Sequence, residues 1–362
     1  MKIKKISMIL SIGFLLIAVS GCQSVFYTYD EAYAVKTKTA PAATITSYAE
    51  LGNGTLKDVS TDGKTLLAFN VSDTLPVTYT IEIFNYETNK WQATNLITSE
   101  KKLYDGVLSE KEQGFYYTEA IMAPAGNVAS MQLVWASLDG ATSRVLTDQN
   151  EHVTSNLCVI SDGGVLYSND RQEVVMVHAN DSKKVYGIND VDQIQDIFYD
   201  AQGDRIFFTA LRENDTTLNL YQAKLTAEPI TPTLVAANVT AFDCDLESGT
   251  LYYLQQSGTA KKLCRMHLEN NALTTIDTDR FERITATGNE EPLIYTLSDE
   301  NETNPLECIY VITEKNKKTA TQITSPKALT GKIFTINHQI FYTSVMDDVP
   351  TIYALSWEIL SE

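Results

Sequence analysis

The chain has 362 residues, with 46 acidic and 28 basic side chains, and 44% of its residues are apolar. This composition excludes low-complexity disorder and a collagen-like chain, and the length is sufficient for one large domain with a sizeable core. The net charge of -18 argues against a nucleic-acid partner, because phosphate binding draws its affinity from clustered Lys and Arg. We therefore expect a folded, acidic protein that does not bind nucleic acid.

The first residues have the pattern of an export signal. Three lysines lie within residues 2–5, and an almost wholly apolar run follows from Ile6 to Val19. This run is shorter than the roughly 20 residues that a membrane-spanning helix needs. We expect residues 1–21 to be a signal peptide that is removed from the mature protein.

The residues that end this run, Val19-Ser20-Gly21-Cys22, resemble a bacterial lipobox. The resemblance implies cleavage between Gly21 and Cys22 and a diacylglycerol on the sulfur of Cys22, whose two acyl chains anchor a protein stably at a bilayer surface. Cleavage would leave 25 basic against 46 acidic side chains, a net charge of -21. We expect a lipoprotein on the extracytoplasmic side of the cell membrane, with residues 22–42 as its lipidated tether. An ordinary signal peptide, or an uncleaved anchor with an incidental Cys, is the alternative.

The rest of the chain repeats one pattern, in which polar turns rich in Asp, Gly or Asn separate short apolar-aromatic strands. The turns before these strands, such as Thr61-Asp62-Gly63 and Ser161-Asp162-Gly163, suit hairpins because Gly and Asp tolerate a positive φ. Seven second-strand segments mark the repeats: residues 65–69, 114–118, 165–168, 206–209, 251–254, 293–296 and 340–343. Seven units over residues 52–360 average about 44 residues, the period of four-stranded propeller blades. We predict an all-β propeller over residues 43–362 with seven blades, while insertions such as residues 120–130 leave six or eight as alternatives.

These repeats resemble TolB-like and YWTD-type β-propeller blades over nearly the whole mature chain. The resemblance implies the fold and carries over no ligand residue, since Leu251-Tyr252-Tyr253-Leu254 lacks the Trp-Thr-Asp of the YWTD repeats. A propeller must close its ring, because an unpaired edge strand favours aggregation. The last repeat, which stops at Glu362, is one strand short, and we predict that residues 43–48 supply the missing strand.

The cysteine and histidine spacings predict no metal site and no cofactor. Cys244 and Cys264 fall on the first and third strands of one repeat, about 10 Å apart and beyond disulfide reach, so we expect free thiols. The histidines lack the spacing of zinc ligands. Residues 243–249 loosely resemble a calcium loop, but Gly249 comes one place late and Gln255 replaces the expected Glu, so we interpret them as a polar turn that opens a strand. The cysteines beyond Cys22 are Cys158, Cys244, Cys264 and Cys308, and the histidines are His152, His178, His267 and His338.

The sequence contains no recognisable catalytic residue set. Gly-x-Ser-x-Gly is absent, and the Ser-x-x-Lys of residues 99–102 lacks its partner motifs. The acidic pairs Glu290-Glu291 and Asp347-Asp348 are interpreted as solvated loop charge. Most aromatic side chains should fill the space between blades, whereas Tyr104, expected on a loop, and the tyrosines of residues 27–29 are candidates to contact a glycan or peptide.

Two functions fit these observations. We favour a non-catalytic binding or scaffold module that holds a protein, peptide or glycan partner outside the membrane. The alternative is a propeller enzyme that acts on extracellular carbohydrate or peptide through carboxylates near the central channel. The acidic charge predicts a basic or cation-bridged partner surface and capture that weakens as salt rises.

Overall fold

The computed structural model describes residues 43–87, 90–123, 128–148, 151–212, 216–225, 229–246, 248–286, 293–298, 306–312 and 320–359. Gly21, Cys22 and the tether lie outside these residues, so their roles stay predictions. All regular structure in the described part of the chain is β-strand. No helix long and apolar enough to cross a membrane occurs in that part.

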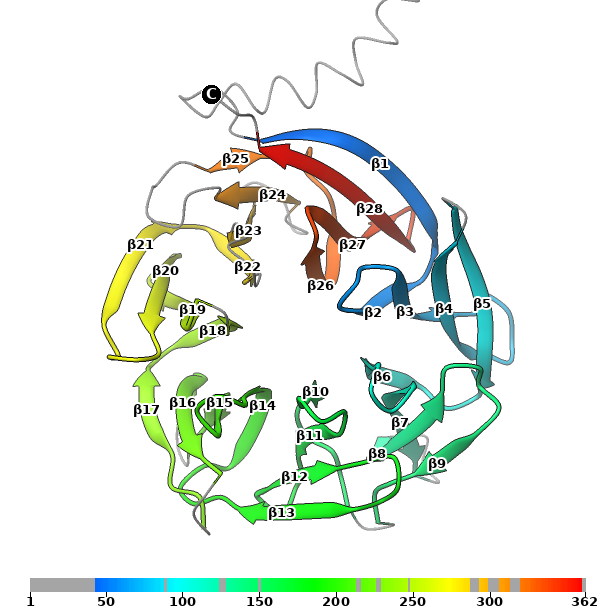
Figure 1. Ribbon diagram of the computed structural model, residues 1–362, viewed down its shortest axis with the longest axis horizontal. Helices are drawn as coiled ribbons and strands as arrows, with labels where there is room; N and C mark the ends of the chain where they lie inside the picture. The colour runs from blue at the N-terminus through cyan, green and yellow to red at the C-terminus, as the bar shows by residue number, and fades with distance from the viewer. Residues whose placement is uncertain are drawn as a thin grey trace, which may run out of the picture.

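The strands form four-stranded sheets around a common axis, which are the blades of a propeller (Figure 1). Blades 1 to 3 contain β2 (Thr55–Val59), β3 (Thr65–Val71), β4 (Tyr79–Glu87) and β5 (Lys90–Ser99); β6 (Leu103–Ser109), β7 (Gly114–Met122), β8 (Val128–Ser137) and β9 (Ser143–Val145); and β10 (Cys158–Val159), β11 (Val165–Ser168), β12 (Glu173–Val177) and β13 (Lys183–Gly187). Blades 4 and 5 contain β14 (Gln193–Asp200), β15 (Arg205–Leu211), β16 (Asn219–Lys224) and β17 (Thr233–Ala236); and β18 (Val239–Asp245), β19 (Thr250–Ser257), β20 (Ala260–His267) and β21 (Leu273–Asp279). Blades 6 and 7 contain β22 (Phe281–Thr285), β23 (Leu293–Ser298), β24 (Glu307–Ile312) and β25 (Thr321–Gln322); and β26 (Leu329–Ile336), β27 (Gln339–Met346), β28 (Val349–Ile359) and β1 (Ala43–Asn53). The prediction of seven four-stranded blades is confirmed.

Within each blade, neighbouring strands pair antiparallel, and the strand order runs outward from the axis. The seven segments expected as second strands coincide with β3, β7, β11, β15, β19, β23 and β27. Their side chains fill the space between blades, as where Leu67 and Phe69 of β3 pack with Leu108, Phe115 and Tyr117 of the next blade. Burial of alternating aromatic and aliphatic residues between blades is therefore the main stabilising contribution.

One aromatic residue is placed differently from the prediction. Tyr104 lies on inner strand β6 rather than on a loop, and it is half-buried. Its carbonyl accepts a 2.6 Å hydrogen bond from Lys57 Nζ, and Lys102 Nζ lies 4.9 Å from its ring centroid. The expectation that Tyr104 lies on a loop is wrong, because strand β6 already begins at Leu103.

The N-terminal strand closes the ring, as predicted, and it is longer than expected. β1 pairs antiparallel with β28 from Ala43 opposite Ile359 to Asn53 opposite Thr351. The ring of Tyr48 stacks on that of Tyr353 with centroids 5.4 Å apart. The strand that completes blade 7 is therefore joined directly to the first strand of blade 1.

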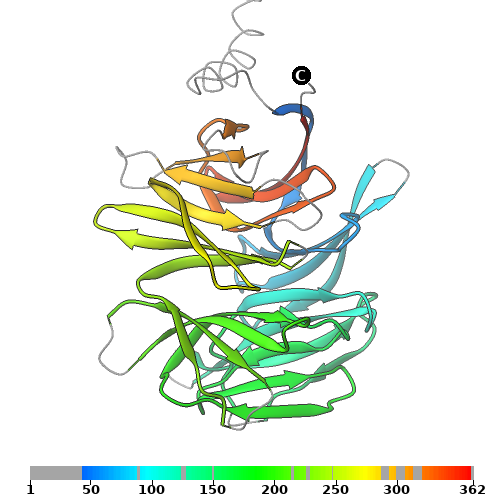
Figure 2. The ribbon, with the colours of Figure 1, turned by 60° about the vertical axis from the view of Figure 1, so that its left-hand side comes forward.

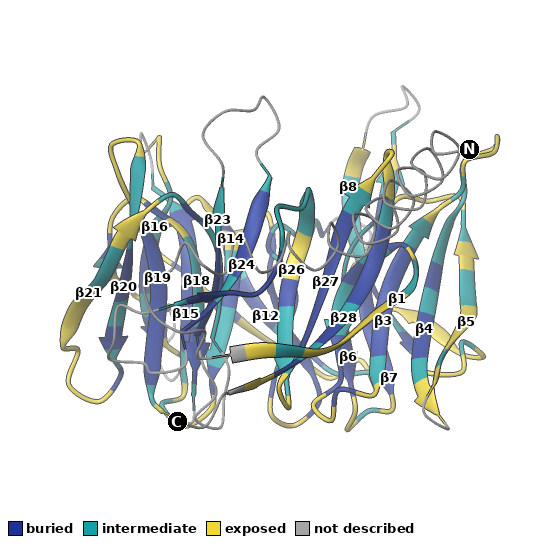
Figure 3. Cartoon of the chain, turned by 90° about the horizontal axis from the view of Figure 1, so that it is seen from above, coloured by how far each residue is buried: buried dark blue, intermediate teal, exposed yellow. Residues whose placement is uncertain are grey.

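The antiparallel order gives the ring two distinct faces, seen edge-on in Figure 3 and obliquely in Figure 2. We call upper the face that carries the hairpins between second and third strands, and lower the face that carries the turns between first and second strands. β28 runs from the upper to the lower face, so β1 begins at the lower face beside Ile359 (Figure 3). The chain therefore enters the described ring at its lower face.

The cysteine prediction is confirmed in the described residues. Cys244 lies on first strand β18 and Cys264 on third strand β20, and neither they nor Cys158 and Cys308 form a disulfide within the described part of the chain. Burial raises the pKa of Cys158 to about 11 and holds that of Cys244 well above its ordinary value. Thiols that stay protonated at neutral pH are poor nucleophiles and poor metal ligands, so their role is packing.

Candidate functional site at the axis of the ring

Six charged side chains on the innermost strands lie near the ring axis, and we call them the axial cluster. They are Lys57 and Asp58 of β2, Asp105 of β6, Asp196 of β14, Asp243 of β18 and Lys332 of β26. These inner strands surround the axis in Figure 1. Lys332 lies within electrostatic reach of all four aspartates, which come from four other blades.

Irregularities in the inner strands place these side chains. The pairing of first with second strands shifts between Leu56 and Asp58 and again between Ile194 and Asp196, as at a β-bulge. An extra residue on one strand changes the direction in which the next side chain points. The backbone N–H of Asp196, which the bulge removes from the strand pairing, bonds to a side chain instead. Asp196 N donates to Oγ1 of Thr209, on second strand β15, at 3.2 Å.

The aspartates of the axial cluster also tie each blade to the next. Leu108 N donates to Asp58 Oδ2 at 2.6 Å, and Ala286 N donates to Asp243 Oδ2 at 2.9 Å. Leu157 N makes the same contact, 2.8 Å long, with Asp105 Oδ2. These carboxylates accept hydrogen bonds from backbone N–H groups of the neighbouring blade. At least part of their role is therefore structural.

Burial near the axis moves the acid–base equilibria of the cluster. It raises the pKa of Asp58 to about 7 and that of Asp243 to about 6, although backbone N–H groups and Lys332 act in the opposite direction. Burial would lower the pKa of Lys332, but Asp105 and the other carboxylates outweigh it and the pKa is raised. The Lys332 side chain is exposed and the four aspartates are half-buried, so solvent screens the charges of the cluster in part. Asp58 and Asp243 therefore change charge within the physiological pH range.

Asp58→Asn is expected to stabilise the protein by about 1 to 2 kcal/mol at pH 8 and by clearly less at pH 5. The pKa of Asp58 in the folded state, about 7, exceeds that of an unfolded Asp, about 4, so the stabilisation by the protonated form is complete below about pH 4 and is lost as pH rises to about 7. Asn keeps an acceptor for Leu108 N and carries no charge. Urea unfolding at both pH values tests this, with Asp62→Asn as control, because hydrogen bonding to Ser60 lowers the pKa of Asp62 and predicts the opposite sign. Equal effects at both pH values would contradict it.

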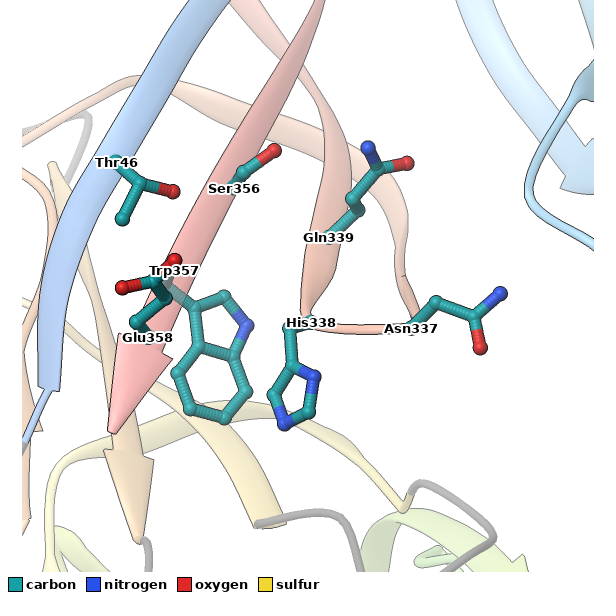
Figure 4. Close-up of a pocket in the computed structure, with 7 residues that line it drawn as sticks. All are labelled: Thr46, Asn337, His338, Gln339, Ser356, Trp357 and Glu358. Carbon is teal, nitrogen blue, oxygen red and sulfur yellow. The ribbon is translucent and has the colours of Figure 1, made fainter. Parts of the chain in front are cut away.

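Apart from the axial cluster, a pocket lies on the lower face of blade 7 (Figure 4). Its volume is about 530 Å³, and Thr46, Asn337, His338, Gln339, Ser356, Trp357 and Glu358 line it. The ring of His338 meets that of Trp357 edge-on with centroids 4.9 Å apart, and Trp357 is only 1% exposed. The indole Nε1 of Trp357 has no hydrogen-bond partner among the described residues. The volume of the pocket suits a small molecule. The indole of Trp357 is buried, however, and offers almost no surface to such a molecule.

The residues weighed in the sequence do not converge on one site. The four histidines lie in different parts of the ring, and no three His, Cys, Asp or Glu side chains of the described chain come close enough to hold a metal ion. Asp347 and Asp348 form the turn between β27 and β28, whereas Glu290 and Glu291 lie outside the described residues. Asp243 lies on inner strand β18, so its assignment to a polar turn is wrong.

Comparison with known proteins supports the fold and leaves the chemistry open. No protein-family model and no curated protein matches this sequence. Oligogalacturonate lyase from Vibrio parahaemolyticus is similar in structure, with 11% identity and a TM-score of 0.61 over 88% of this chain and 98% of that chain. An uncharacterised protein from Listeria monocytogenes gives 11% identity and a TM-score of 0.52 over 81% and 89% of the two chains. TolB from Acinetobacter baumannii gives 12% identity and a TM-score of 0.49 over 74% of this chain and 64% of that chain, and we base no argument on it.

Proposed function

We propose that this chain is a binding module anchored to the outer side of the cell membrane through lipidated Cys22. The observation that carries the proposal is the direction of β1, which begins at Ala43 beside Ile359 on the lower face. A tether of residues 22–42 would then reach the ring at this face and hold it toward the bilayer. The upper face is left free for a protein, peptide or glycan partner, which suits a scaffold whose loops carry the function.

Cys22→Ser is expected to abolish incorporation of a fatty-acid label into the protein, because the thiol of Cys22 is the proposed attachment point. Cys158→Ser is the matched control and should keep the label, since Cys158 lies on inner strand β10. Metabolic labelling in the native host, with mass spectrometry of the N-terminal peptide, measures both. A label that survives Cys22→Ser, or a mature chain that does not begin at Cys22, would contradict the anchor.

Capture by cross-linking in intact cells tests the binding role. A photo-reactive residue at Thr74, on the upper face of blade 1, is expected to recover one partner in near-stoichiometric yield. The same residue at Asp181, on the lower face of blade 3, should recover little. Capture should weaken as salt rises, because the mature chain has a net charge of -21 from 25 basic and 46 acidic side chains. Equal recovery at both positions would contradict the proposed orientation.

The axial cluster favours one alternative function. Two carboxyl groups with pKa values of about 7 and 6, on Asp58 and Asp243, have the acid–base properties of catalytic groups in a propeller enzyme that acts on carbohydrate or peptide. Turnover of oligosaccharides that is lost in Asp58→Asn, in a protein that remains folded, would favour this alternative over binding alone.

A further inference from the structure

Exposed apolar side chains gather on three hairpins of the upper face. Leu75, between β3 and β4, is 90% exposed, Met122 at the end of β7 is 49% exposed and Met346 at the end of β27 is 57% exposed. Val71, Val77, Val128 and Val349 flank them and are also exposed. We call these seven residues the apolar hairpin surface. Exposed apolar groups that gather on one face mark interaction sites more often than scattered ones do.

The three hairpins belong to consecutive blades. They lie on blades 7, 1 and 2, and β2 of blade 1 contacts both β26 of blade 7 and β6 of blade 2. The corresponding turns of blades 3 and 5 are polar: residues 169–172 read Asn-Asp-Arg-Gln, and residues 257–259 read Ser-Gly-Thr. The apolar character is therefore confined to one side of the upper face, within the hairpins that the structure describes.

The charges on the hairpins of this surface are acidic, and the nearby lysines, Lys101 and Lys102, lie in the connection between β5 and β6, where Lys101 pairs with Glu119 of β7 at 2.6 Å. Asp73 precedes Leu75 in its hairpin, and Asp347 and Asp348 separate Met346 from Val349. Residues 72–78, 122–128 and 346–349 contain no Lys or Arg. Acidic rims around apolar groups complement a partner that has both apolar and basic side chains. They are repelled by the anionic surface of a bilayer, which attracts polybasic segments.

We propose that the apolar hairpin surface docks a basic amphipathic segment of a partner protein. The proposal rests on the proposed function, because the anchor at the lower face is what leaves the upper face free. Leu75, Met122 and Met346 supply the apolar contacts. The Met side chains are unbranched and flexible, so they can adapt to the surface of a partner. Asp73, Asp347 and Asp348 attract the basic side chains and set the orientation.

The test uses the mature protein in nanodiscs of neutral phosphatidylcholine and three probes. These are an amphipathic helical peptide of Lys and Leu, its counterpart of Glu and Leu, and vesicles of anionic phosphatidylglycerol. The triple variant Leu75→Ser, Met122→Ser and Met346→Ser removes the apolar anchors. The control triple variant, Val145→Ser, Val185→Ser and Leu234→Ser, removes side chains that are 49%, 41% and 51% exposed on the outermost strands β9, β13 and β17.

We expect the protein to bind the Lys and Leu peptide and not the Glu and Leu peptide. The first triple variant should weaken this binding about tenfold or more, and the control should change it less than about twofold. Equal losses in the two variants, equal binding of both peptides, or preferential binding of the vesicles would overturn the proposal. Concentration-dependent self-association that only the first variant abolishes would overturn it in favour of a second copy of this chain.

The two proposals fail in different ways. If cross-linking in cells captures a partner but the first triple variant has no effect on the Lys and Leu peptide, the binding role stands and this surface is not its site. If the peptide binds as expected but capture from the upper face fails, the surface stands and the anchored orientation is wrong.

Discussion

Replacing Lys332 by Met is expected to destabilise the protein by about 1 kcal/mol at pH 8, a fall of about 2 degrees in the midpoint of thermal unfolding. The substitution removes the cation that four aspartates share near the axis. Loss of one partner of a fully buried ion pair costs about 3 to 5 kcal/mol, and contact of Lys332 with solvent reduces that cost here. The loss should exceed that from a lysine that lies outside the axial cluster.

The effect should be smaller at pH 5, because Asp58 and Asp243 contribute less of the negative charge there. Lys332 lowers the pKa values of Asp58 and Asp243 against the effect of burial, so both values rise further without it. A carboxyl group whose pKa is raised in the folded state gives its full stabilisation below the unfolded pKa and loses it as pH rises through the folded pKa. At pH 5 both groups are mostly protonated and need the cation less.

Lys64→Met is the matched control for Lys332→Met. The Lys64 side chain is 65% exposed and lies 4.0 Å from Asp62, so its removal should change stability by less than about 0.5 kcal/mol at either pH. Thermal unfolding of both variants at pH 5 and pH 8 gives the comparison. A loss in Lys332→Met that is the same at the two pH values would show that the side chain acts by packing and not by charge.

The sequence predicts the blades well because second strands carry a strong local pattern. In β7, for example, Phe115, Tyr116 and Tyr117 follow directly on the turn at Gly114 and are buried. Strands of this kind are apolar on both faces because they pack between two neighbouring blades. The outermost strands are harder to assign, since β9 and β21 are largely exposed and their polar residues resemble those of loops.

The axial cluster was not predicted as a group. Its members lie on five different repeats, and each repeat contributes only one or two of them from a short first strand. Only the ring closure brings Asp105 and Lys332 together, and the bulge that directs each side chain depends on pairing with the second strand. An aspartate that recurs in the first strand of four of the seven repeats, as Asp58, Asp105, Asp196 and Asp243 do, is the signal that would have found the cluster.

Removal of β1 is expected to have the largest effect on stability. A chain that starts at Gly54 should unfold about 10 °C or more below a chain that starts at Ala43, or should aggregate. Strand β1 covers the outer edge of β28, whose Leu355 and Trp357 are each 1% exposed. Without it the core cluster that contains these side chains loses the packing of Ile45, and the row of unpaired backbone groups on β28 becomes available to another chain.

The shorter chain also loses the covalent closure of the ring. Blades 7 and 1 would then be held only by contacts such as the 2.9 Å hydrogen bond from Leu56 N to Thr343 Oγ1 and the packing of Phe341 against the apolar core of blade 1. Thermal unfolding and sedimentation of the two chains test this, and a synthetic peptide of residues 43–53 should restore part of the lost stability. The chain that starts at Ala43 is the control for loss of the tether. Equal midpoints for the two chains would mean that the contacts between blades 7 and 1 close the ring without β1.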